Sequence, residues 1–203
     1  TTDQVQALTS TQLQAMETRD LAAFTTAQVR ALTSDQFQAL TTEQIKGLSS
    51  AQVEALETQD LVALTTAQIR ALDASDLALL STEQLQVLTT AQVEALTTEQ
   101  IVKLTTEQVS KLTIAQLQAL TTEQMAAMQG VDVASLTTAQ VVALSTAQVQ
   151  ALTTAQIVAL TTEQFAARET ADLAALSPAQ VQALQGSDLA ALSRPAIARR
   201  VAL

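Results

Sequence analysis

The chain of 203 residues contains no cysteine, histidine, tryptophan or tyrosine, and only 3 phenylalanines, 3 glycines and 2 prolines. Without cysteine there is neither a disulfide framework nor a thiolate metal site, so the sequence carries no information about the redox compartment. Without histidine and cysteine, the commonest general base, metal ligand and strong nucleophile of enzymes are missing. These absences exclude most catalytic and metal-binding classes of protein.

Positive charge is also scarce, because 10 Lys and Arg residues stand against 20 Asp and Glu residues and leave a net charge of −10. Nucleic-acid binding needs a basic surface opposite the phosphates, so we expect no nucleic-acid partner. No apolar run approaches the roughly 18 residues of a membrane span, so we expect no membrane insertion. The chain starts at Thr1 without a secretory signal, which we interpret as the start of a mature product or an excised fragment.

What the sequence does contain is an eight-residue repeat, here called the octad, whose first copies start at Thr1, Thr9, Glu17 and Thr25. Twenty-five octads follow one another without insertion or deletion. Position 5 is apolar in all 25, position 8 is Leu in 20 and position 7 is Ala in 18, whereas positions 3 and 6 vary freely. We therefore expect positions 5 and 8 to form the core, position 7 to allow close helix approach, and positions 3 and 6 to face solvent.

The octad fits neither one long helix nor a strand. In a continuous helix an eight-residue repeat would rotate by about 80° per copy, so no apolar stripe would persist. In a strand, positions 5 and 8 would lie on opposite faces, and Ala, Gln and Glu are poor strand formers.

The recurring Ser/Thr at position 1 and Gln at position 4 form instead the pattern of a capping box, which starts a new helix. Helices this short are unstable alone and need stacked neighbours. The sequence therefore predicts an all-α solenoid, a superhelical coil of 25 octapeptide repeats with one short capped helix per repeat.

The distribution of charge supports the same prediction independently. Eighteen of the 20 acidic residues lie at positions 1, 3 or 4, and 8 of the 10 basic residues lie at positions 6, 7 or 8. Acidic residues near the N-terminus and basic residues near the C-terminus are what a helix dipole favours. The polarity repeats with the octad period, as separate helices require.

Six octads depart from the Thr/Gln rule at positions 1 and 4 together, and each has Asp at position 4. Because the residues at positions 1 and 4 change together, we predict that their side chains are in direct contact. Because these octads are spaced by 5, 2, 7, 5 and 2, we predict a coil of about 2.3 octads per turn that aligns Asp20, Asp76, Asp132 and Asp188 along one side. The six pairs are Glu17 with Asp20, Glu57 with Asp60, Asp73 with Asp76, Gln129 with Asp132, Glu169 with Asp172, and Gln185 with Asp188.

Four of these pairs are wholly acidic, and clustered carboxylates are what divalent cations prefer. Two ligands are fewer than the six to eight oxygens that surround Ca²⁺, and carboxylates also suit helix N-termini without any metal. We therefore expect the helix-terminal role and no cofactor, with divalent-cation binding as the alternative. The candidate metal ligands are Glu17, Asp20, Glu57, Asp60, Asp73, Asp76, Glu169 and Asp172.

Catalysis needs a nucleophile beside a base, or titrating groups in unlike surroundings. Here the hydroxyl groups belong to repeated positions, and no unique cluster of residues interrupts the array. We expect no enzymatic activity and identify no catalytic or cofactor-binding residue.

Residues 143–156, ALSTAQVQALTTAQ, show the form Leu-Thr-x-x-Gln-Val-x-Ala. The whole chain in this respect resembles octapeptide arrays of large repetitive bacterial surface or secreted proteins that are described as haemagglutinin-like or adhesin-like. The resemblance implies a structural or spacer segment, extracellular or at the cell surface, that associates with itself or with neighbouring repeats of a longer chain. The alternative is a binding module, because Ser or Thr at position 2 in 19 octads could present a regular row to ice, glycan or another ordered surface.

The two ends of the array differ in sequence. Residues 1–192 keep the octad pattern, whereas residues 193–203 hold a degenerate octad with Arg194, Arg199 and Arg200. Because solenoids need polar terminal caps, we expect a C-terminal cap there and an uncapped stacking surface at the N-terminal octads.

Overall fold

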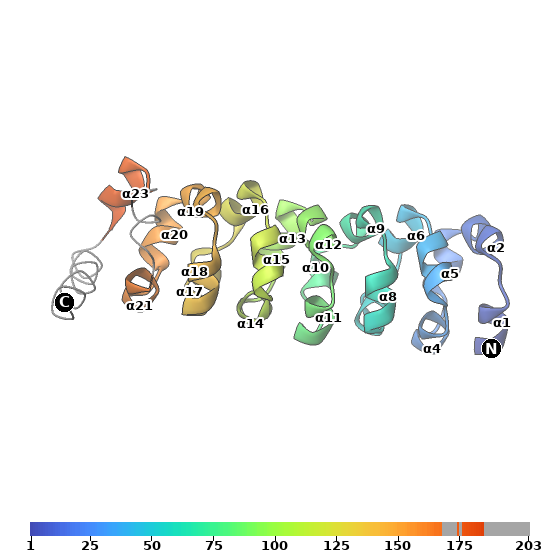
Figure 1. Ribbon diagram of the computed structural model, residues 1–203. Helices are drawn as coiled ribbons and strands as arrows, with labels where there is room; N and C mark the ends of the chain where they lie inside the picture. The colour runs from blue at the N-terminus through green and yellow to red at the C-terminus, as the bar shows by residue number, and fades with distance from the viewer. Residues whose placement is uncertain (168–173, 175, 185–203) are drawn as a thin grey trace. The chain divides into compact units, whose positions relative to one another are not determined.

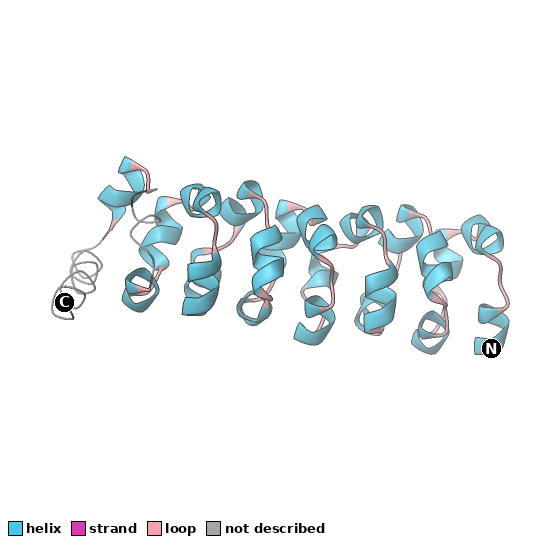
Figure 2. Ribbon diagram, viewed as in Figure 1, coloured by secondary structure: helices cyan, strands magenta, loops and turns pink. Residues whose placement is uncertain are grey.

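The structure, a computed structural model, describes residues 1–167, 174 and 176–184. These residues form 22 α-helices of four to six residues with short loops between them, and no strand occurs among them (Figure 1, Figure 2). The predicted all-α solenoid with one short helix per octad is confirmed. The helices are α1 (Thr2–Gln6), α2 (Ser10–Ala15), α3 (Thr18–Ala22), α4 (Thr26–Arg30), α5 (Ser34–Ala39), α6 (Thr42–Lys46), α7 (Ser50–Glu54), α8 (Thr58–Ala63), α9 (Thr66–Ala71), α10 (Ala74–Leu77), α11 (Thr82–Gln86), α12 (Thr90–Ala95), α13 (Thr98–Lys103), α14 (Thr106–Lys111), α15 (Ile114–Ala119), α16 (Thr122–Ala127), α17 (Gly130–Ser135), α18 (Thr138–Ala143), α19 (Thr146–Ala151), α20 (Thr154–Ala159), α21 (Thr162–Ala166) and α23 (Pro178–Ala183).

The chain divides into two compact units, Thr1–Leu104 and Thr105–Leu203, and the octad is the building block of both. The predicted boundary between residues 192 and 193, and the predicted C-terminal cap with Arg194, Arg199 and Arg200, lie outside the described residues.

Most of the described helices begin at the predicted capping box, whereas α3 and α10, whose octads start with Glu17 and Asp73, lack it. In α9, for example, the Thr65 hydroxyl accepts a hydrogen bond from the Gln68 backbone N–H at 3.2 Å, and the Gln68 side-chain oxygen accepts one from the Thr65 backbone N–H at 2.7 Å. The same reciprocal pair is present in every described helix whose octad starts with Ser or Thr. The box satisfies two of the four orphan N–H groups at each helix start.

The turn between successive helices uses extended backbone. Leu40 at position 8 has φ −60° and ψ 141°, and Thr41 at the next position 1 has φ −72° and ψ 159°. No described residue has a positive φ, so the turn needs no glycine. An array of this length can therefore be built with only 3 glycines.

The core follows the predicted positions except in the octad of residues 177–184, where Val181 at position 5 is 45% exposed. Position 5 is buried in each of the first 21 octads, from Val5 to Phe165, with at most 4% of any side chain exposed. Position 8 is buried from Leu32 to Leu160. Position 3 is exposed throughout the described part of the chain, and position 6 is exposed or half-buried. Burial of each Val, Ile or Leu contributes roughly 2 kcal/mol, so the two apolar rows supply the stability that helices of this length lack.

Within each unit, the described helices pack against the described helix three octads further on. In the first unit α1 packs on α4, α2 on α5, and so on to α10 on α13. In the second unit α14 packs on α17, α16 on α19 and α17 on α20. Position 2 of one octad meets position 7 of the octad three later: a Cβ atom on Gly130 would lie 3.2 Å from the Cβ atom of Ala159. The small residue expected at position 7, Ala in 18 octads, suits this close approach.

Candidate functional site

The glutamine at position 4 does more than cap its own helix. Gln92, which is 3% exposed, accepts a hydrogen bond from the Thr89 backbone N–H at 2.8 Å through its side-chain oxygen. Its side-chain nitrogen donates to the carbonyl oxygens of Leu61, at 2.8 Å, and Leu64, at 2.7 Å. These carbonyls end helix α8, four octads earlier, where the last carbonyls have no partner within the helix. One amide thus satisfies the start of one helix and the end of another.

The same bonds recur along both units, and we call them inter-turn hydrogen bonds. The side-chain nitrogen donates to the carbonyl oxygen 28 residues earlier, at position 8, and in most cases also to the one 31 residues earlier, at position 5. In the first four octads Gln4, Gln12 and Gln28 cap their own helices but show no such bond and are not buried. The residues that make inter-turn hydrogen bonds include Gln36, Gln44, Gln52, Gln68, Gln84, Gln92, Gln100, Gln140, Gln148, Gln156, Gln164 and Gln180.

These contacts correct the predicted coil. Described helices pack on the octad three away, and most glutamines at position 4 bond to the octad four away, so one turn holds between three and four octads. The prediction of about 2.3 octads per turn is wrong. The spacing of seven octads between successive predicted aspartates remains compatible with their alignment along one side of a coil, because seven octads equal one three-octad step plus one four-octad step. Asp20 and Asp76 belong to the first unit and Asp132 to the second, while Asp188 lies outside the described residues.

The inter-turn role of glutamine was missed, although the sequence carried a signal for it. A capping box accepts either Gln or Glu at position 4. In this chain position 4 is Gln in 18 octads and never Glu, while Glu is common at position 3. Only the amide can accept and donate at once, so the exclusion of Glu indicates that the side-chain nitrogen has a partner of its own.

The Asp octads make a different contact. Asp76 accepts a hydrogen bond from the Ser50 hydroxyl at 2.5 Å, and Asp132 accepts one from the Thr106 hydroxyl at 2.8 Å. In both cases the hydroxyl stands at position 2 of the octad three earlier. At these two positions aspartate therefore replaces bonding to a backbone four octads away with bonding to a side chain three octads away.

The described candidate metal ligands contact groups of the protein itself. Glu17 forms an ion pair with Arg19 at 2.8 Å, and the Asp20 side chain is 55% exposed. Asp73 accepts from the backbone N–H of Ser75 at 2.8 Å. Among the described residues no three Asp or Glu side chains gather closely enough to hold a metal ion. Glu169 and Asp172 lie outside the described part of the chain.

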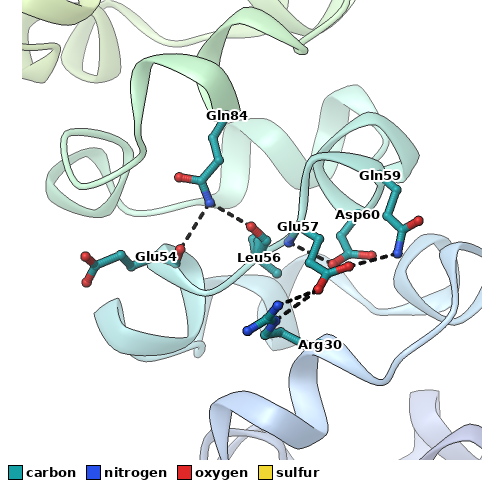
Figure 3. A network of polar contacts seen from close by, with 7 residues as sticks. All are labelled: Arg30, Glu54, Leu56, Glu57, Gln59, Asp60 and Gln84. Atoms are coloured by element: carbon teal, nitrogen blue, oxygen red, sulfur yellow. Dashed lines mark hydrogen bonds and ion pairs between the residues drawn. The ribbon is translucent and has the colours of Figure 1, made fainter.

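Glu57 and Asp60 lie in a network of polar contacts in the first unit (Figure 3). Arg30 of α4 donates to Glu57 at 2.7 Å and 3.0 Å, across four octads. Asp60 accepts from the backbone N–H of Glu57 at 2.9 Å, and Gln59 donates to the second Glu57 oxygen at 3.1 Å. The Arg30–Glu57 ion pair thus connects octads four apart where Asp60 has replaced the glutamine that makes this connection elsewhere.

No helix in the described part of the chain is long and apolar enough to cross a membrane.

Comparison with known proteins supports the repeat directly. A family model described as the ALTTAQ repeat matches residues 13–50, 53–90, 71–106, 84–114 and 126–162. A search of curated proteins found no match. The matched segments span several consecutive octads each and together cover most of the chain. With its capping boxes, its two apolar rows and its unbroken octad register, this chain belongs to the ALTTAQ repeat family.

Proposed function

We propose that the chain is a non-catalytic structural or spacer segment of a bacterial surface or secreted protein. The observation that carries the proposal is the use of the repeated polar groups. The position 1 hydroxyl and the position 4 amide, which recur in most octads, are engaged in capping and in inter-turn hydrogen bonds. Because these side chains form hydrogen bonds with the backbone of the same chain, they stabilise the regular stacking of octads, as a structural or spacer segment requires.

Extracellular or cell-surface location, and self-association with copies of the chain or with neighbouring repeats, complete this proposal. The resemblance of ALSTAQVQALTTAQ to repeat arrays of surface and secreted proteins supports it, and so does the net charge of −10, which favours solubility. Adhesion would then reside at the edges or ends of the array.

A binding module for ice or glycan is the second candidate, and one observation favours it. Threonines at position 2, such as Thr90 and Thr98, are exposed, so their side chains are open to a flat ligand. The row is interrupted, however, by Ala74, which is buried, and by Ile114, which is 46% exposed. Such interruptions weaken a match to a regular lattice.

The two functions are separated by measuring retention of the labelled chain on ice, on polysaccharides and on whole cells. The spacer function predicts retention no greater than that of an unrelated acidic protein, and unchanged retention when Thr90 and Thr98 are both replaced by valine. Retention on ice or glycan that disappears in Thr90→Val/Thr98→Val, but persists when the exposed Glu83 and Glu99 at position 3 are replaced by glutamine, would establish the binding module instead. Sedimentation at increasing concentration tests self-association separately.

A further inference from the structure

Asp60 is a buried carboxylate with one unsatisfied oxygen. The residue is 0% exposed, and its Oδ1 atom has no hydrogen-bond partner. The other oxygen accepts from the Glu57 backbone N–H at 2.9 Å. Burial raises the pKa of Asp60 to about 6, helped by the nearby Glu57 carboxylate and opposed by the backbone hydrogen bond and by Arg30. A buried charge with an orphan oxygen is costly, so this octad stands out from the rest of the array.

Two other octads with a buried aspartate at position 4 show which hydrogen bond Asp60 lacks. Asp76 and Asp132 each use Oδ1 to accept from a hydroxyl 26 residues earlier, Ser50 and Thr106 respectively. The residue 26 before Asp60 is Ser34, which has the same kind of hydroxyl, yet Asp60 Oδ1 receives no bond. Asp60 is therefore the one described buried aspartate whose Oδ1 lacks this donor.

The charged groups that act on the Asp60 carboxyl are Glu57 and Arg30. Other charged residues belong to the helices next to α8 and are exposed. The helices packed against α8 are α5, with Asp35, and α11, with Glu83, while α4 carries Arg30 and the preceding helix α7 carries Glu54. Arg30 is the one cation of this set, and it already pairs with Glu57 (Figure 3). The surroundings thus offer Asp60 little compensation for its negative charge.

We propose that the octad of residues 57–64 is a proton-sensitive joint of the first unit, in which protonation of Asp60 tightens the packing of α8 against its neighbours and ionisation loosens it. Protonation removes the buried charge, and it gives the side chain an O–H donor, the capacity that the glutamine amide supplies at this position in most octads. This pH dependence of the packing of α8 does not depend on whether the chain acts as a spacer or as a binding module.

The direction of the effect follows from the pKa. Because the folded pKa of about 6 lies above the ordinary aspartate pKa of 3.8, the contribution of Asp60 to stability is greatest below pH 3.8 and is lost as the pH rises through 6. Between pH 7.5 and pH 5, the equilibrium constant for local opening of this octad should fall about tenfold.

The experiment is hydrogen exchange of the full chain at pH 5 and pH 7.5, corrected for the intrinsic pH dependence of exchange. The backbone N–H groups of Leu61 and Leu64, bonded to the carbonyls of Glu57 and Asp60, report on the joint. The octad of residues 153–160 has no titratable side chain and serves as the internal reference. We expect the protection of Leu61 and Leu64 to be about tenfold greater at pH 5, with little change in the reference.

Asp60→Asn keeps the shape of the side chain and removes its charge. In this variant the Leu61 and Leu64 N–H groups should be protected at pH 7.5 at least as well as in the wild type at pH 5, and their protection should not change with pH. Asp132→Asn, at the site where Thr106 already donates, is the matched control and should leave the response of Leu61 and Leu64 intact. A wild-type chain whose joint is equally protected at both pH values, or better protected at pH 7.5, would overturn the proposal without reference to any variant. So would a pH response that survives in Asp60→Asn.

Discussion

Replacing Gln92 with glutamate is expected to lower the free energy of unfolding of the first unit by about 4 kcal/mol at neutral pH. The substitution keeps the size of the side chain and the oxygen that caps Thr89. It removes the donor to the Leu61 and Leu64 carbonyls and places a negative charge against both of these oxygens, at a site that is 3% exposed. Urea-induced unfolding followed by far-UV circular dichroism measures the loss.

The matched control is Gln12→Glu. Gln12 caps Thr9 in the same way but is exposed and shows no inter-turn hydrogen bond, so the change should cost less than about 0.5 kcal/mol. The loss in Gln92→Glu should also shrink as the pH falls, because a buried glutamate binds its proton more tightly in the folded state. Equal effects at the two positions would mean that capping alone explains the glutamines.

Truncation of the core row is expected to have an effect of similar size. Leu61 at position 5 is 0% exposed, and Leu61→Ala should cost about 2–5 kcal/mol through lost apolar burial and the cavity that remains. The neighbouring Val62 at position 6 is 47% exposed, and Val62→Ala should change stability by less than about 0.5 kcal/mol. Chemical denaturation of the two variants under the same conditions provides the comparison. A loss in Val62→Ala comparable to that in Leu61→Ala would show that the octad positions are assigned to the wrong faces.

The local structure could be predicted from sequence because its causes are local. The cap formed by Thr65 and Gln68, and the charge polarity of the octads that carry charge, depend on residues a few positions apart. The same holds for the burial of position 5 and the exposure of position 3, which follow from the 3.6-residue turn once the helix start is known.

The number of octads per turn could not be obtained in the same way. It depends on which helices meet across the coil, and the spacing of the Asp octads allows more than one answer, since a seven-octad period fits two turns as well as three. The contacts decide: Gln92 bonds to the octad that ends at Leu64, and α9 packs on α12. The orphan oxygen of Asp60 is equally hidden in the sequence, because Ser34 and Ser50 precede their aspartates by the same 26 residues and only Ser50 donates.

The most direct test of the coil is a disulfide between two octads three apart. The chain has no cysteine, so an engineered pair gives an unambiguous result. A Cβ atom at residue 130 would lie 3.2 Å from that of Ala159, close to the roughly 3.5–4.5 Å of a disulfide. The comparison pair joins Gly130 to Ala151, two octads away, which a coil of about 2.3 octads per turn would bring together.

Under mild oxidation, with products identified by mass spectrometry of a peptide digest, Gly130→Cys/Ala159→Cys should form the intramolecular disulfide nearly completely. Gly130→Cys/Ala151→Cys should stay reduced. Cross-linking of the Ala151 pair in preference to the Ala159 pair would contradict the packing of helices three octads apart, and with it the account of this repeat.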